Sequence, residues 1–410
     1  MALVATALLL PISGHTQSLN EAVNSQLASN IITGRVCSEL RSGSPGPPDF
    51  LTGELYAICT RGGPSGGNPA SFSTGGGTAT PTTLPSIVQQ RLREAYSKGK
   101  KHETKPKPGG ASADAVAEYA NGLGLFISGE FQRLDRNVTR FEDGYGSTIG
   151  RMAAGADYQF TDRIMAGLAF DYYQQDGNFD SGGDFNNHSY GFLAFGSFRP
   201  FEEAFLQVTA GYARNEYDRT RFSTFTELNS DGSLNFKSTP GSQNADYNAD
   251  EARVGALLGY DYHIRNITIS PRAGVDFRQI DFGTYSDTGV TGLELTFHDE
   301  SQTWLQTRVG AQALVALKTR FAVLVPHASV DWKHELSNDQ RNVQVSFVGD
   351  MRAKRFTYQT ESPDRDWFEI NAGVSAALPH GLQSYVNYRV LVGHSFFDSH
   401  AGMIGLRYTF

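Results

Sequence analysis

The sequence predicts an all-β protein: a twelve-stranded antiparallel transmembrane β-barrel, preceded by short helical segments. Three observations lead to this prediction. From residue 122 to the last residue, apolar and polar side chains alternate over stretches of about ten residues, as in strands with two different faces. Aromatic residues lie near the ends of the apolar faces, while the opposite faces hold charges of both signs. Short and long connections between these stretches alternate, as periplasmic turns and outer loops do in bacterial barrels.

The composition excludes several other classes. A mean hydropathy of -0.36 is too polar for a helical membrane protein, and 12% aromatic residues argue against intrinsic disorder. The net charge of -8 gives no basic field for nucleic acid, so we expect no nucleic-acid partner. The 2 cysteines are too few for a disulfide-rich scaffold or a four-thiolate zinc site, and the sequence predicts no cofactor and no metal.

Residues 1–17 are predicted to be a signal peptide. Met1–Ile12 is an apolar run with the length of a signal-peptide core, and it is too short to cross a bilayer as a helix. No Lys or Arg precedes this run, and no clean small-residue cleavage site follows it. A truncated or wrongly chosen start is therefore the alternative interpretation.

Residues 18–81 are expected to form a short segment with little core of its own. Apolar residues at helical spacing predict a short helix within Ser18–Leu40, and Leu51–Thr60 is a second short segment. Cys37 and Cys59 are predicted to form a disulfide, because an isolated pair in an exported chain usually closes one; two free thiols are the alternative for a cytosolic chain. Gly62–Thr80 has the composition of a flexible linker.

Residues 82–121 contain a predicted helix and a charged linker. Pro85 lies in the first turn of the helix Pro85–Lys98, where proline is tolerated. The helix is basic through Arg91, Arg93 and Lys98. The tract that follows it is rich in charge and proline.

The barrel domain, residues 122–410, contains twelve predicted strands, the even number that a single-chain bacterial barrel requires. They are Leu123–Leu134, Ile149–Phe160, Ile164–Asp176, Phe185–Phe198, Phe205–Phe222, Ala252–Ile264, Ile267–Phe282, Trp304–Leu317, Phe321–Leu336, Phe368–Leu378, Leu382–Val392 and Ala401–Phe410.

Charged residues on the polar strand faces are expected to point into the lumen. By phase they are Glu130, Arg151, Asp157, Asp171, Glu251, Arg253, Arg272, Asp276, Arg278, Arg308, Asp331, Glu335, Glu369, Arg389 and Arg407. One interpretation is a self-neutralised, hydrated wall. The other is that some of the carboxylates (Glu130, Asp331 and Glu335) hold the basic helix through ion pairs with its Arg and Lys side chains.

The same strand faces offer a weak hint of catalysis. His327 and Asp331 share the lumenal face, so a His–Asp pair is conceivable there. No serine motif of the outer-membrane phospholipase kind accompanies them, and lumenal hydrogen bonding is the simpler interpretation. The sequence therefore predicts a protein that is not an enzyme.

Four segments in order carry a family resemblance: Pro326–Leu336, Val345–Gly349, Asn371–Val374 and Gly405–Phe410. On the basis of these segments, the region from about Leu123 to the last residue resembles the translocator domain of autotransporters, the type V secretion family. The resemblance implies a helix that threads the barrel lumen, a place that Pro85–Lys98 suits. The terminal strand, with Leu406, Tyr408 and Phe410, would then present the signal read by the barrel-assembly machinery.

Two features depart from the family pattern. The region before the predicted helix is much shorter than a typical passenger, and the helix lacks the Asn-Asn pair at which some members cleave themselves. The function expected is an outer-membrane autotransporter that brings its own N-terminal segment to the cell surface, as a monomer, with lipid, lipopolysaccharide, periplasmic chaperones and the assembly machinery as partners. The alternatives are a helix-plugged pore or adhesin that exports nothing, and an outer-membrane hydrolase.

Overall fold

The structure is a computed structural model, which describes residues 122–139, 142–180, 182–222, 224–228, 234–238, 242–290, 294–337, 341–362 and 364–410. The predicted signal peptide, the Cys37–Cys59 pair and the helix Pro85–Lys98 lie outside these residues and stay predictions. Within the described part of the chain, no helix is long and apolar enough to cross a bilayer.

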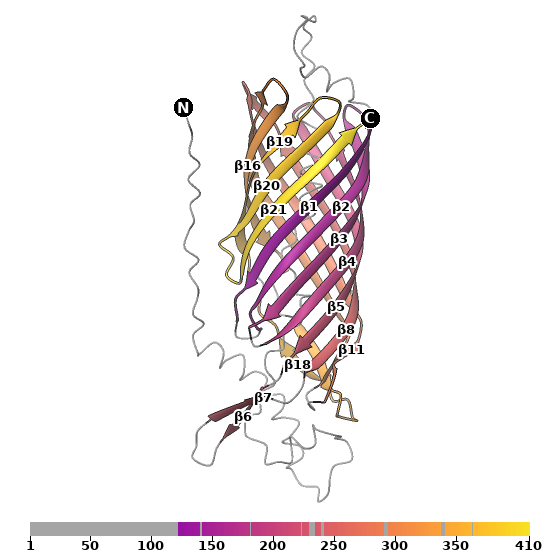
Figure 1. The fold of residues 1–410 in the computed structure, drawn as a ribbon, viewed down its shortest axis with the longest axis vertical. Helices are drawn as coiled ribbons and strands as arrows, with labels where there is room; N and C mark the ends of the chain where they lie inside the picture. The colour runs from indigo at the N-terminus through magenta and orange to yellow at the C-terminus, as the bar shows by residue number, and fades with distance from the viewer. Residues whose placement is uncertain are drawn as a thin grey trace, which may run out of the picture.

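Twelve long strands form a closed antiparallel barrel (Figure 1), as the alternating pattern predicts. They are β1 (Leu123–Arg136), β2 (Tyr145–Thr161), β3 (Ile164–Phe179), β4 (Gly183–Phe198), β5 (Ala204–Arg221), β8 (Gln243–Tyr260), β10 (Ile267–Phe282), β14 (Glu300–Val315), β16 (Val323–Glu335), β19 (Asp366–Ala377), β20 (Leu382–Val392) and β21 (Phe397–Thr409). Each strand pairs with the next one in this order, and β21 pairs with β1.

The pairing of β1 with β21 closes the wall. Its register runs from Gly124 opposite Thr409 to Arg136 opposite Phe397, and the Phe410 amide donates to the Leu123 carbonyl oxygen at 3.1 Å. Closure matters because a backbone group left unpaired in lipid costs several kcal/mol, roughly, for each group. It also brings the start and the end of the barrel to the same rim.

The last strand has the two faces that its sequence predicts. Ile404, Leu406 and Tyr408 point outward and are exposed, whereas Arg407 and Thr409 are buried on the inner side. The same alternation puts exposed apolar side chains around the whole barrel near the Phe410 end. On each strand this outer apolar run covers about ten residues, the length of a tilted transmembrane strand.

The polarity of the wall reverses beyond this apolar belt. On β5 the outward residues change from Val208 and Tyr212 to Arg214, Glu216 and Asp218, all of them exposed. Among the inward residues at this level are two buried apolar clusters: Leu134, Tyr145, Ile149, Tyr173, Phe179 and Phe185, and Tyr217, Ala245, Tyr247, Ala249, Ile280 and Phe282. The barrel therefore extends past the membrane as a wall with a polar, water-facing outside and apolar clusters on its inside.

This reversal explains where the predicted strand boundaries are wrong. β8 begins at Gln243 instead of the predicted Ala252, and β21 begins at Phe397 instead of Ala401. In both additions the outward residues are polar, as Asp246 on β8 and Asp398 on β21 show, so a search for outward apolar residues ends too early. At its other end β8 stops at Tyr260, and a separate strand, β9 (Tyr262–Ile264), pairs with β10.

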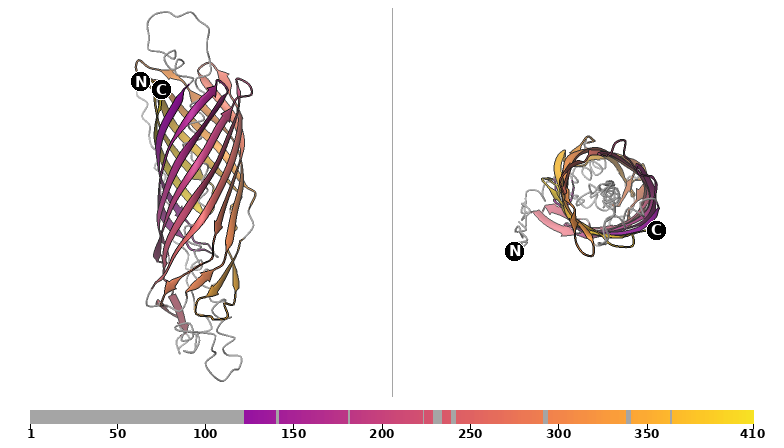
Figure 2. Two further views of the ribbon diagram at one scale, coloured as in Figure 1. Left: turned by 90° about the vertical axis from the view of Figure 1, so that its right-hand side faces the viewer. Right: turned by 90° about the horizontal axis from the view of Figure 1, so that it is seen from above.

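The remaining strands are short. Four of them, β11 (Tyr285–Ser286), β13 (Leu295–Phe297), β17 (Asn342–Phe347) and β18 (Phe356–Gln359), form a sheet that we call the mouth sheet. It lies at the end of the barrel with the long connections, opposite the Phe410 rim (Figures 1 and 2). The others are β6 (Thr224–Leu228), β7 (Leu234–Ser238), β12 (Thr288–Gly289) and β15 (Leu317–Lys318).

Replacing Phe410 with Ser should reduce the amount of folded barrel in the outer membrane several-fold. The Phe410 side chain is 60% exposed to the lipid side, and its ring lies edge-on to Tyr408 at 4.9 Å. Loss of its burial in lipid removes roughly 1.5–3 kcal/mol from the strand that closes the wall. Heat-modifiable mobility on unboiled gels measures closure.

Phe160→Ser is the matched control. Phe160 is 61% exposed at the same rim, on β2, so it loses similar burial without altering the terminal strand. Equal amounts of folded barrel in the two variants would contradict a special role for the C-terminal residue.

Candidate functional site

The lumen is lined by the charged residues that the strand phase places inside. All fifteen side chains named above are buried or half-buried on the inner face of the wall. The two interpretations of these charges differ in whether their partners belong to the wall itself.

Ion pairs within the wall neutralise most of these charges. The pairs link neighbouring strands or span one or two intervening strands: Arg407–Asp157 (2.6 Å), Arg389–Glu130 (2.7 Å), Arg253–Asp171 (2.6 Å), Arg278–Glu251 (2.9 Å), Lys333–Glu369 (3.0 Å), Arg308–Asp276 (3.5 Å) and Arg272–Asp331. A wall built this way is braced around its circumference by charge-assisted bonds. It matches the self-neutralised wall of the first interpretation.

The three carboxylates expected to hold the helix already have partners in the wall. Glu130 accepts from Arg389 and Asp331 accepts from Arg272, while Glu335 accepts the backbone amides of Leu305 at 3.1 Å and Ser337 at 2.9 Å. The predicted helix lies outside the described residues. Its ion pairs with these three residues therefore stay a prediction.

His327 and Asp331 each contact another group of the wall. The Asp331 carboxylate is held by Arg272, whose Nε lies 2.7 Å from Asp331 Oδ1, and His327 Nδ1 lies 3.2 Å from the Val325 carbonyl oxygen. Across the described ranges, no group of three or more His, Cys, Asp or Glu residues is placed to bind a metal ion.

One part of the lumenal wall is apolar, and the sequence analysis did not predict this cluster. Phe126 and Phe195 lie edge to face with ring centroids 5.8 Å apart, in a buried cluster with Ala153, Met165, Ala169 and Leu193 on β1 to β4. Gly167 makes room for the Phe195 ring, since a Cβ there would lie 2.4 Å from the ring Cζ atom. The lumenal face of β1 to β4 thus combines an apolar patch with charged side chains such as Glu130, Asp157 and Asp171.

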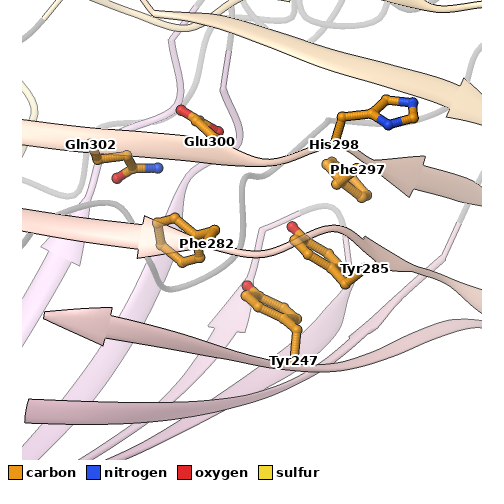
Figure 3. Close-up of a pocket in the computed structure, with 7 residues that line it drawn as sticks. All are labelled: Tyr247, Phe282, Tyr285, Phe297, His298, Glu300 and Gln302. Carbon is orange, nitrogen blue, oxygen red and sulfur yellow. The ribbon is translucent and has the colours of Figure 1, made fainter.

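At the outer end, aromatic rings connect the wall to the mouth sheet. Tyr217 stacks on Tyr247 with centroids 4.9 Å apart, Tyr247 on Tyr285 at 3.9 Å, and Tyr285 on Phe297 at 4.8 Å. A small pocket remains beside this stack, lined by Tyr247, Phe282, Tyr285, Phe297, His298, Glu300 and Gln302 (Figure 3). Its volume of about 10 Å³ suits roughly one water molecule and is far too small for an organic ligand.

A buried histidine stabilises the loop between β20 and β21 at the same end. Nδ1 of His394 accepts the backbone amides of Phe396 at 3.2 Å and Phe397 at 3.3 Å, and its ring lies 5.0 Å from that of Trp367. Burial lowers the pKa of His394 to about 4, because the opposing effect of Asp364 is smaller. The neutral ring is the form that can accept both amides.

The geometry defines a class of protein: an outer-membrane β-barrel with a lipid-facing belt, a charged lumen and both of its ends at one rim. The family model for the autotransporter beta-domain matches residues 125–389, well over half of the chain. The chain therefore belongs to the autotransporter family, and its location is the bacterial outer membrane.

Individual relatives agree with this assignment. The translocator domain of the autotransporter NalP from Neisseria meningitidis matches with a TM-score of 0.55 and 15% identity, over 79% of this chain and 96% of that one. The beta domain of the Bordetella autotransporter BrkA matches with a TM-score of 0.50 and 17% identity, over 71% and 100%. At these identities the likeness concerns the fold.

Among curated proteins, outer membrane protein A of Rickettsia conorii is 24% identical over 309 residues. The match covers 72% of this chain and 14% of the rickettsial protein. An equivalent protein of Rickettsia rickettsii matches over the same length, at 13% of its sequence. The chain thus spans a small fraction of these relatives.

Breaking a buried lumenal ion pair should destabilise the barrel. Arg407→Met leaves Asp157 buried without its guanidinium partner, which costs about 3–5 kcal/mol in comparable buried pairs. Urea titration followed by the gel mobility of the folded form measures the loss. Arg133→Met is the control, because the exposed Arg133–Asp135 pair is worth under about 1 kcal/mol. Equal midpoints for both variants would contradict the bracing role.

The loop around His394 should open more readily in acid. Since its pKa is lowered from 6.5 to about 4, the opened loop takes up a proton between these values while the closed loop does not. Stability of the closed loop is therefore complete above pH 6.5 and is lost as the pH falls toward 4. Hydrogen exchange of the Phe396 and Phe397 amides, corrected for intrinsic rates, measures this opening. His394→Gln should remove the pH dependence; an unchanged profile in that variant would assign it to another group.

Proposed function

We propose that this barrel is an autotransporter translocator through which the chain's own N-terminal segment reaches the cell surface. The observation that supports it most directly is the position of β1. Gly124 lies opposite Thr409 at the rim with the short turns, the periplasmic end of a bacterial barrel. A segment that precedes β1 and ends outside the cell must therefore cross the membrane.

The lumen is the physically acceptable route for that crossing. The outer face of the wall is apolar and meets lipid, where a peptide backbone without hydrogen-bond partners cannot lie. The inner face offers charged and polar side chains such as Asp157, Arg253, Arg272 and Glu369, which a hydrated chain can pass. The closed β1–β21 pairing leaves no lateral opening along its register.

After export, we expect the helix Pro85–Lys98 to remain in the lumen. Its Arg91, Arg93 and Lys98 would approach the inner carboxylates, with Glu130, Asp331 and Glu335 as the partners proposed from the sequence. These carboxylates also hold wall residues, so the helix would share them in networks of more than two charges. This sharing would fix the helix while leaving the wall intact.

The same proposal includes the partners needed for assembly. The outward face of the last strand, with Leu406, Tyr408 and Phe410, is the segment that the barrel-assembly machinery would read, after periplasmic chaperones deliver the unfolded chain. Outer-membrane lipid and lipopolysaccharide would then surround the apolar belt. We expect the barrel to act as a monomer.

The packed outer end favours a second candidate, a plugged pore that exports nothing. The mouth sheet buries Leu295, Val345 and Phe347 almost completely, and the pocket beside the aromatic stack has room for about one water. Such a barrel would keep residues 18–80 in the periplasm. The two candidates therefore differ in the location of this segment.

Protease treatment of intact cells separates the two candidates. Antibodies against residues 18–80 should lose their signal when protease is added outside, because the exported segment is accessible. One control carries an epitope in the hairpin between β17 and β18, and another carries it in the short turn 199–203. The hairpin epitope should be cleaved and the turn epitope kept. Survival of residues 18–80 alongside loss of the hairpin epitope would refute export and favour the plugged pore.

A further inference from the structure

The mouth sheet is attached to the barrel in an unusual way. Its four strands pair with one another and, in the described residues, with no barrel strand. In the described residues, the loop that carries β11 and β13 is paired to the wall at one short place. There, Thr288 and Gly289 of β12 pair with Asn244 and Gln243 of β8. Side chains must therefore supply most of the attachment.

Asp287, next to this bridge, contacts both sides. Its carboxylate binds Nη2 of Arg219 at 2.8 Å and Nη2 of Arg221, both on the inner face of β5. It also accepts the backbone amide of Leu295 in β13 at 3.1 Å, and the Asp287 amide donates to the Leu295 carbonyl oxygen at 2.8 Å. One carboxylate thus joins a barrel strand to two segments of the loop.

The charged groups of this site are almost completely buried. The Asp287 side chain is 0% exposed and that of Arg219 is 1% exposed. The Arg219 guanidinium lies over the Phe297 ring at 5.0 Å and near the Tyr285 ring at 5.9 Å, so the same cation also contacts two rings of the mouth sheet. Burial alone would raise the pKa of Asp287, but Arg221 and Arg219 more than offset this and keep the carboxylate charged.

We propose that Asp287 is a latch that holds the mouth sheet across the outer end of the barrel. With the latch closed, the aromatic stack from Tyr217 to Phe297 is packed and the end of the lumen is blocked. With the carboxylate neutralised, Arg219 and Arg221 lose the charged group that binds both of them, and the sheet moves outward on its connections to β10, β14, β16 and β19. This latch acts at the mouth whether or not the N-terminal segment is exported.

The test measures the accessibility of the residue that the latch covers. In a chain with Cys37→Ser and Cys59→Ser, Leu295→Cys places a thiol at a position that is fully buried when the sheet is closed. A bulky maleimide is added to intact cells that display the full-length protein. We expect labelling to be at least tenfold faster when Asp287→Asn is added, and also with Arg221→Gln, which leaves the loop sequence unchanged.

Asp350→Asn is the matched control. Asp350 is another buried loop carboxylate, but its bonds with Arg352 stay within the β17–β18 hairpin. Its labelling rate should equal that of the parent protein. If Asp287→Asn or Arg221→Gln labels no faster than Asp350→Asn while heat-modifiable mobility shows a folded barrel, the latch does not exist.

Hydrogen exchange of the unsubstituted protein keeps the proposal testable even if these variants fail to fold. The amides of Asp287 and Leu295 should be protected to the same extent as those in β17, because they open together with the sheet. Rapid exchange at both amides, with β17 still protected, would show that the latch is open in the native protein and would overturn the proposal.

Discussion

A backbone amide or carbonyl without a partner is too costly in lipid, and this constraint determines the rest of the molecule. It requires the wall to close, which β1 and β21 achieve through the register from Gly124 opposite Thr409 to Arg136 opposite Phe397. Closure divides every strand into a lipid face and a lumenal face. It also places the start of β1 and the end of β21 at one rim, the rim with the short turns. The proposed route of export follows from that placement.

The length of the strands produces the second property of the barrel, its change of polarity. About ten residues of each strand suffice to cross the bilayer, yet β5 and β8 have 18 residues each. The additional residues stand in water, so their outward side chains are polar, as Asp246 and Asp250 show. Their inward side chains can then be apolar, and Tyr217 and Tyr247 provide a surface on which loop segments fold. The lumenal wall is thus cross-braced by ion pairs at membrane level, and at the outer end stacked aromatic rings join it to the mouth sheet.

The sequence predicted the strands well and the contacts between them poorly. All twelve strands, and the outward face of β21, follow from period-two alternation, which is a local property. The start of β8 was missed because its outer half has the opposite polarity, and the mouth-sheet strands β17 and β18 were missed because they lie within a long connection. The partners of the lumenal charges depend on register and shear: Arg253 reaches Asp171 across two intervening strands, a contact that no local pattern contains. The Asp287 site, likewise, joins residues 66 and 68 positions apart in the sequence.

Closure in the stated register is the central claim, and paired cysteines test it most directly. In a chain with Cys37→Ser and Cys59→Ser, the pair Ile127→Cys and Leu406→Cys occupies directly opposite, outward positions on β1 and β21. Oxidation of the folded protein in outer membranes should join them within the chain, giving a band of altered mobility that reductant abolishes. The pair Ile127→Cys and Ile404→Cys is displaced by two residues and should stay largely unjoined. Preferential joining of the displaced pair, or no joining of either pair in a folded barrel, would contradict the closed wall described above.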